Sequence, residues 1–370
     1  MNSGYKQSLF WGGESRYGSA GAIDEALGLV QSINPTESNS LIKIRTLGGT
    51  RDYSNIVPGK FEITGSFEYY LQDGPFFRQA LGEDTGTTAT VDTGPRVHTG
   101  WGEAASAYCH VMGSAESPTT DDFPSFTLEF TDAEDTGAAA TTKNLKRLYD
   151  GCRVNSMTIS GSVDEPVKVA VDFQAQGVTV STGAATSVTE PTTDPFVFYQ
   201  GVVYCTAGAV VEDTSIAAMS TSARICEVNS FDVSVNNNLE AIWYVSGTCT
   251  PSGQTKRGLK NLIVKGRDYE ANLGLHFKNR SMYQKFLGAT SATTDQDTLA
   301  KYTIVLDFVR SGTIGAVKTV TDNYLRIVLG SCAFNTINIP GNPEDVISQN
   351  LNVFVEKAKF YVVDDDLSYA

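Results

Sequence analysis

The chain has 370 residues, and its 42 acidic and 28 basic residues give a formal net charge of −14. Hydrophobic residues make up 41% and aromatic residues 10%, which excludes a disordered chain because such chains are poor in aromatics. The acidic balance argues against a surface that neutralises nucleic-acid phosphates. No apolar run reaches the ~18 residues of a membrane span, and the start has no apolar signal-peptide core. We therefore expect a soluble protein that is made in a cytoplasm and has no membrane partner.

The first well-marked element is a strand over residues 60–71. Its buried face is predicted to carry Phe61, Ile63, Phe67, Tyr69 and Leu71, which alternate with polar residues in the period-two pattern of a half-buried strand. A polar turn follows. A short amphipathic helix comes next, and its apolar face is predicted to carry Phe76, Phe77, Ala80 and Leu81.

Residues 83–125 are rich in Thr, Gly, Ala and Asp, which predicts a long exposed loop or arm. Strands are expected at 125–130, 151–160 and 167–173, where β-branched and aromatic residues gather between turn formers. Residues 182–223 have the composition of a linker, with room for an extra strand at 196–199 or 202–204.

The second half repeats these elements in the same order. Residues 266–288 match 59–82, residues 330–340 match 151–160, and Val228-Asn229-Ser230 matches Val30-Gln31-Ser32. The second copy of the strand is predicted to bury Tyr269, Ala271, Leu273, Leu275 and Phe277. The second helix is predicted to present Met282, Tyr283, Phe286 and Leu287 on one face. Strands are also expected at 241–246, 302–308 and 347–353.

Three matches in one order predict an internal duplication. The predicted fold is all-β with minor α, built from two tandem β-barrel or sandwich modules with one short helix each. The predicted organisation is an N-terminal arm (1–24), a first module (25–181), a linker (182–223), a second module (224–364) and a C-terminal tail (365–370).

No arrangement of residues typical of catalysis is present. The histidines His98, His110 and His276 have no metal-ligand spacing. The six cysteines form no CxxC pair and are expected to be reduced and mostly buried. Acidic clusters near 121–122, 132–135 and 364–366 lack the ligand order of a calcium loop. We expect no enzyme activity, no metal and no cofactor.

Several short motifs occur in an order that resembles the tail tube proteins of long-tailed phages and related archaeal viruses. They are Glu14 to Gly18, Gly49 to Arg51, the strand after Gly59, Val154 to Ile159, Val228 to Ser230, Asn236 to Leu239, and Gly266-Arg267. The resemblance implies a β-barrel subunit whose strands join those of its neighbours around a lumen. Rings then stack into a tube that conducts viral DNA. Because this family commonly forms six-fold rings from single modules, two fused modules imply a trimeric ring with pseudo-six-fold symmetry.

The resemblance also implies a location in the virion tail. The implied partners are further copies of the chain, the tape-measure protein and viral DNA in the lumen without specific binding, and sheath, baseplate and tail terminator proteins. A lumen lined by carboxylates repels DNA, so Glu62, Glu68, Asp268 and Glu270 are hypothetical lumen residues. The competing interpretation is that these side chains lie on an ordinary solvated exterior.

Two other functions fit a β-rich chain of this kind. One is another virion structural protein, such as a baseplate hub or a decoration protein. The other is a carbohydrate-binding or hydrolytic β-sandwich, which needs exposed aromatics or paired acids in a cleft. The three tryptophans, Trp11, Trp101 and Trp243, are widely spaced and form no obvious aromatic platform.

Overall fold

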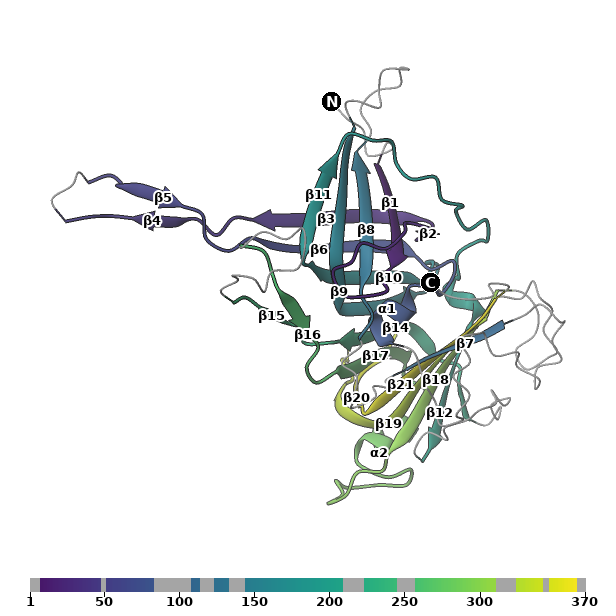
Figure 1. Ribbon diagram of the computed structural model, residues 1–370. Coiled ribbons are helices and arrows are strands. Elements are labelled where there is room, and N and C mark those ends of the chain that lie inside the picture. Colours follow the sequence, from purple (N-terminus) through teal and green to yellow (C-terminus); the bar gives the residue numbers. More distant parts are fainter. Residues whose placement is uncertain are drawn as a thin grey trace.

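The computed structural model describes residues 7–47, 51–82, 108–113, 123–132, 144–208, 223–244, 257–310, 324–341 and 346–364. Within these ranges the protein is built from antiparallel β-sheets with two short α-helices (Figure 1). The predicted class, all-β with minor α, is confirmed.

A continuous antiparallel sheet of eight strands runs through both halves of the chain. Its order is β3 (Val30–Ser38), β6 (Glu62–Tyr70), β10 (Lys168–Ala175), β9 (Leu145–Ser162), β14 (Val228–Asn236), β17 (Asp268–His276), β20 (Ser348–Val355) and β19 (Tyr324–Asn338). The two halves meet where β9 pairs with β14, from Ser156 opposite Asn236 to Ser162 opposite Ser230. We call this sheet the continuous sheet.

Each half also has an outer sheet. The first consists of β2 (Glu25–Ala26), β1 (Gln7–Gly13), β8 (Phe126–Asp132), the beginning of β9, and β11 (Gly177–Ser181). The second consists of β13 (Arg224–Ile225), β12 (Gly201–Ala207), β18 (Tyr302–Val309), the beginning of β19, β21 (Lys357–Asp364) and β7 (Tyr108–Gly113). The long strands β9 and β19 therefore pass from an outer sheet into the continuous sheet.

β9 and β19 change sheets at equivalent positions. Gly151 (φ 62°) and Ser331 (φ 52°) both adopt a left-handed backbone conformation, which favours glycine and strains a residue with a side chain. The cysteine that follows each of them, Cys152 or Cys332, is free and buried. Register shifts next to Asn155 and Asn335 mark matching β-bulges further along.

Among the described residues the main core cluster spans both halves, and a small second cluster is formed by Val202, Tyr204 and Val305. Helix α1 (Phe77–Leu81) closes the first sandwich, and the Phe76 ring just before it contacts Trp11, Phe67 and Phe126 edge to face at 5.2 to 5.3 Å. Helix α2 (Ser281–Phe286) occupies the corresponding place in the second half. Its apolar face differs from the prediction: Met282 is buried, but Tyr283 is exposed.

Two hairpins leave the continuous sheet. The first, β4 (Ile42–Ile44) with β5 (Asn55–Val57), projects far from the sheets (Figure 1). The second, β15 (Glu240–Ile242) with β16 (Asn261–Ile263), lies against the first half of the chain.

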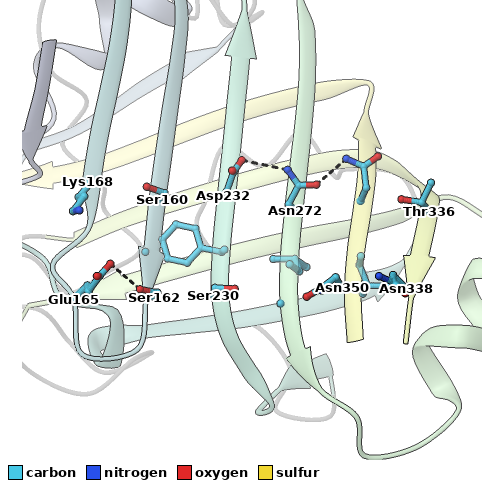
Figure 2. Close-up of a pocket in the computed structure, with 16 residues that line it drawn as sticks. Ser160, Ser162, Glu165, Lys168, Ser230, Asp232, Asn272, Thr336, Asn338 and Asn350 are labelled. Carbon is cyan, nitrogen blue, oxygen red and sulfur yellow. Dashed lines mark hydrogen bonds between the residues drawn. The ribbon is translucent and has the colours of Figure 1, made fainter. Parts of the chain in front are cut away.

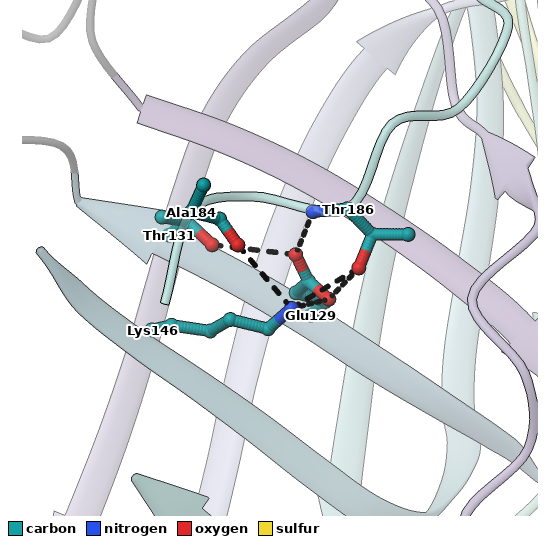
Figure 3. A network of polar contacts seen from close by, with 5 residues as sticks. All are labelled: Glu129, Thr131, Lys146, Ala184 and Thr186. Carbon is teal, nitrogen blue, oxygen red and sulfur yellow. Dashed lines mark hydrogen bonds and ion pairs between the residues drawn. The ribbon is translucent and has the colours of Figure 1, made fainter. Parts of the chain in front are cut away.

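Among its described residues the predicted linker 182–223 contains strand β12, which covers the candidate strand at 202–204. A 3-10 turn (η3, Phe198–Gln200) takes the place of the other candidate strand, at 196–199. Buried Glu129 accepts hydrogen bonds from the Thr186 amide (2.7 Å) and hydroxyl (2.6 Å) and pairs with Lys146 at 2.7 Å (Figure 3). This network fixes the segment after β11 to the first outer sheet.

Other strand predictions agree closely with the structure. Ile63, Phe67, Tyr69 and Leu71 are buried, as are Tyr269, Ala271, Leu273 and Leu275. Phe277 is exposed, against the prediction, because β17 ends at His276 and Phe277 follows the strand. The predicted arm at 83–125 contains strand β7, which pairs with β21 of the second outer sheet. The tail 365–370 lies outside the described residues.

Candidate functional site: the polar face of the continuous sheet

One face of the continuous sheet packs on the core and the other faces solvent. Residues opposite each other on neighbouring strands share a face, so the pairing register identifies the solvent face strand by strand. That face carries hydroxyl, amide and carboxylate side chains, with one example from each strand in order: Thr36, Ser66, Asp172, Thr158, Ser234, Asn272, Asn352 and Asn338. We call it the polar face.

The polar face is hollowed over its second half. An open groove of about 510 Å³ is lined by side chains from β9, β14, β17, β20 and β19 (Figure 2). Lys168 and Glu165 stand at one end of the groove, and Thr336 and Asn338 at the other. The small side chains of Gly161, Gly274 and Ser230 are among those that leave room for this groove.

A chain of side-chain hydrogen bonds crosses four neighbouring strands in this groove. Asn272 donates to Asp232 at 3.5 Å, Asn352 donates to Asn272 at 2.8 Å, and Asn335 donates to Asn352 at 2.8 Å. Figure 2 shows the first two of these bonds. Asn272 and Asn352 each donate one of these bonds and accept another. We call this row of side chains the asparagine ladder; Asp232 is its one charged member.

The four acidic residues predicted for a lumen all lie on the polar face. Glu62 and Glu68 are in β6, opposite Ser38 and Ala170, while Asp268 and Glu270 are in β17, opposite Asn236 and Ser234. β10, β9 and β14 lie between these two strands, so the four residues share a surface but form no single cluster. Lys60 pairs with Glu62 at 2.9 Å and Lys168 with Glu68 at 3.8 Å, at partly exposed positions.

The two ends of the continuous sheet are open among the described residues. β3 pairs there only with β6, and the Ala333–Asn338 part of β19 pairs only with β20. Ile33, in the edge strand β3, is half-buried, whereas Phe231, at the corresponding position of β14, is buried. Open edges of this length offer unsatisfied backbone groups to another strand.

Comparison with known protein families identifies the family of this chain. The model of a family described as phage tail tube protein matches residues 4–353. The chain belongs to the phage tail tube protein family. No curated protein matches it. A tail tube protein is a structural component of a virion tail that assembles with copies of itself, and this role is not an enzyme class.

Sequence reasoning missed part of the polar face of this tail tube protein. Asp172 in β10 and Asp232 in β14 lie on it beside the predicted acids. Both could have been found from the alternation of buried and polar residues along 168–175 and 228–236. The asparagine ladder could not, because it depends on which strands become neighbours.

The described part of this tail tube protein contains no group of three or more His, Cys, Asp or Glu side chains placed to hold a metal ion. His276 is exposed, and His98 lies outside the described residues. Cys152, Cys205 and Cys332 are free and buried, and Cys226 is exposed. Within the described ranges no helix is long and apolar enough to cross a membrane.

Proposed function

We propose that this chain is the major subunit of the tube wall, and that copies close into rings by pairing β19 of one copy with β3 of the next. The observation that carries this proposal is the β9–β14 junction. In the order of the continuous sheet β9 is the outermost strand of the first half, and it pairs with β14, the outermost strand of the second half. Repeating that junction between copies is a head-to-tail contact, which closes into a ring when the rotation per copy allows.

The likeness of the two halves supports this repetition. Both β3 and β14 carry a register shift after their first residue, at Val30/Ser32 and Val228/Ser230. Both are followed by a residue with positive φ, Ser40 or Asn238. We infer that 25–181 and 224–364 are copies of one module. Strand β1 of the arm 1–24 pairs with β8 of the first copy, and strand β12 of the linker 182–223 pairs with β18 of the second copy.

Packing at the β9–β14 junction also supports the proposed pairing of β19 with β3 of the next copy. A Cβ on Gly161 of β9 would lie 2.6 Å from the Phe231 ring of β14, so the glycine makes room for that ring. Gly341 stands in the corresponding position after β19, and nothing lies within 4 Å of its Cβ position. The proposed ring brings Ile33 of the next copy, the counterpart of Phe231, over Gly341.

The strand register defines the shape of such a ring. From Ile33 the pairing runs through Phe67, Val171 and Met157 to Val235, four residues beyond Phe231, the counterpart of Ile33. A shift of four residues over four strands is one residue per strand. A closed eight-stranded barrel with a shear of eight has this ratio and a strand tilt of about 36°.

The number of strands in three copies sets the diameter of the proposed channel. They supply three sheets of eight strands, or 24 strands. With strands about 4.8 Å apart and tilted about 36°, the barrel is about 45 Å across between backbones. We propose this trimeric, pseudo-six-fold ring as the unit that stacks into a tube, with room for the tape-measure protein and then for DNA.

The polar face suits the wall of that channel. Glu62, Glu68, Asp268 and Glu270, together with Asp172 and Asp232, would repel a DNA backbone. Lys60 and Lys168 are paired with Glu62 and Glu68, and the side chains between the acids are mostly hydroxyl and amide groups. We propose that DNA passes without specific binding, that assembly takes place in the host cytoplasm, and that sheath, baseplate or terminator proteins meet the tube at its outer surface and ends. The role requires no catalytic residue and no cofactor.

Electron microscopy combined with native mass spectrometry of the purified protein tests the proposal. We expect hollow stacked rings with three chains each. A single ring that never stacks would favour the alternative of a baseplate hub. Rings whose polar face points outward would contradict the lumen assignment.

A further inference from the structure

The two hairpins that leave the continuous sheet correspond residue by residue. β4 follows β3 at the same spacing as β15 follows β14, so Asn39, Ile42 and Ile44 correspond to Asn237, Glu240 and Ile242. β5 precedes β6 as β16 precedes β17, so Arg51, Tyr53 and Ile56 correspond to Arg257, Leu259 and Leu262. The hairpin formed by β15 and β16 is called the second hairpin below, and that of β4 and β5 the first.

The second hairpin docks on the first half of its own chain. The Phe61 amide donates to the Arg257 carbonyl at 3.0 Å, and the Arg257 guanidinium donates to the Gly59 carbonyl at 2.7 Å. Gln176 donates to the Lys260 carbonyl at 2.9 Å, and Lys60 lies 4.3 Å from the centre of the Trp243 ring. The hairpin is thus held by backbone, side-chain and cation–π contacts.

Burial separates the two hairpins sharply. Leu259 and Leu262 of the second are 3% and 0% exposed, whereas their counterparts in the first, Tyr53 and Ile56, are 44% and 52% exposed. Leu41, Ile42 and Ile44 are exposed as well. An arm with this many solvent-facing apolar side chains is typical of an interface.

We propose that the first hairpin docks on the second half of the neighbouring copy in the ring, as the second hairpin docks on the first half within one chain. This inference rests on the proposed ring. In that ring the second half of one copy lies beside the first half of the next copy, as the two halves lie side by side within one chain. The occupant of the docking surface is thus a second copy of this chain, placed by the same step that relates the two halves.

The correspondence names the contacts. Arg51 takes the place of Arg257 and reaches the Lys265 carbonyl, the counterpart of Gly59, while its own carbonyl accepts from the Arg267 amide. The Asn39 amide group takes the place of Asn237, which donates to the Val154 carbonyl at 3.0 Å, and reaches the Phe334 carbonyl. Asn335 and Lys265 at this surface are exposed in the single chain.

The first hairpin is itself basic. It carries Lys43, Arg45 and Arg51, and Asp52 is the acidic residue among its described positions. Like charges disfavour contact between two such arms.

Two serine substitutions on the first hairpin test the docking. Ile56→Ser alters a residue whose counterpart is fully buried, whereas Ile42→Ser alters one whose counterpart, Glu240, stays exposed in the docked hairpin. The two isoleucines are almost equally exposed, at 52% and 54%. We expect Ile56→Ser to raise the protein concentration needed for ring formation at least about tenfold and Ile42→Ser to change it less than about twofold.

A crosslink identifies the receiving copy. The test variant combines Arg51→Cys with Lys265→Cys in a Cys226→Ser background. In single unstacked rings a short bismaleimide should crosslink its chains to one another. The two variants that carry only one of these cysteines should not be crosslinked. If crosslinks form only in stacked tubes, the hairpin contacts the next ring and the inference is wrong. If Ile56→Ser assembles like the unaltered protein, the docking is wrong while the ring stands. If the unaltered protein forms no ring, the proposed function itself fails.

Discussion

The side-chain amide of Asn237 donates a hydrogen bond to the carbonyl of Val154 at 3.0 Å, and so ties the second half of the chain to the first. Asn237 is fully buried, donates also to the Ala80 carbonyl at 3.1 Å, and accepts from Arg267 at 2.7 Å. A buried amide with partners on both of its polar atoms holds the junction in one geometry.

Replacing Asn237 by Ala should weaken the junction between the halves. The change leaves two buried carbonyls and the Arg267 guanidinium without this partner, which costs about 2 to 4 kcal/mol. Urea unfolding of the single chain measures the loss. Asn39→Ala, at the corresponding exposed position, is the matched control: it removes one exposed hydrogen bond from Arg257 (2.7 Å) and should cost less than about 1 kcal/mol. Equal losses for the two variants would contradict this role.

Asp307 and Arg326 form a buried ion pair in the second outer sheet. Arg326 donates to both carboxylate oxygens, at 2.6 and 2.7 Å, and Tyr324 adds a third bond at 2.8 Å. Asp307→Ala leaves a buried guanidinium uncompensated and should lower the free energy of unfolding by about 3 to 5 kcal/mol. Glu240→Ala, which breaks the exposed pair with Lys265, should cost less than about 1 kcal/mol. A loss below 1 kcal/mol for Asp307→Ala would refute the prediction.

Glu129 should make the attachment of the 182–197 segment sensitive to acid. Burial alone would raise the pKa of Glu129, but hydrogen bonds from Lys146 and Thr186 outweigh it and hold the pKa below the usual value of 4.5. A lowered folded-state pKa stabilises the protein fully above the usual value, and this stability is lost as the pH falls through the folded-state pKa.

Unfolding free energies of the unaltered protein and of Glu129→Gln between pH 7 and pH 3 measure this effect. Glu129→Gln should be less stable at pH 7, and the difference between the two proteins should shrink below about pH 4.5. A difference that stays constant down to pH 3 would show that Glu129 carries no such linkage.

The periodic elements of this fold could be predicted from the sequence because burial on one face of a strand leaves a local signature. The alternation through Ile63, Phe67 and Tyr69 needs no knowledge of partners. The match of Val30-Gln31-Ser32 with Val228-Asn229-Ser230 coincides with a register shift in both strands, so a short sequence likeness marked equal backbone geometry.

Features that depend on distant partners could not be predicted in the same way. The pairing of β7 with β21 joins residues about 250 positions apart, and no local pattern in 83–125 indicates it. Tyr283 has the spacing of a core residue but is exposed, while its neighbour Met282 is buried; which of the two faces the core depends on how α2 packs against distant strands. The polar face was predicted from its acids alone, since the asparagine ladder appears only when β14, β17, β20 and β19 are neighbours.

The pairing of β19 with β3 of the next copy is the central claim, and a disulfide tests it directly. Thr158 lies opposite Ser234 in the junction within the chain, so the ring brings Asn338 opposite Thr36 of the neighbouring copy, with Cβ atoms about 5 Å apart. Asn338→Cys with Thr36→Cys, oxidised after assembly and run on a denaturing gel without reductant, should give dimers and trimers and no larger species. Asn338→Cys with Glu37→Cys, one residue out of register and so on opposite faces, should give none. Monomers only from the first pair, or a ladder that continues past three chains, would contradict the closed trimeric ring.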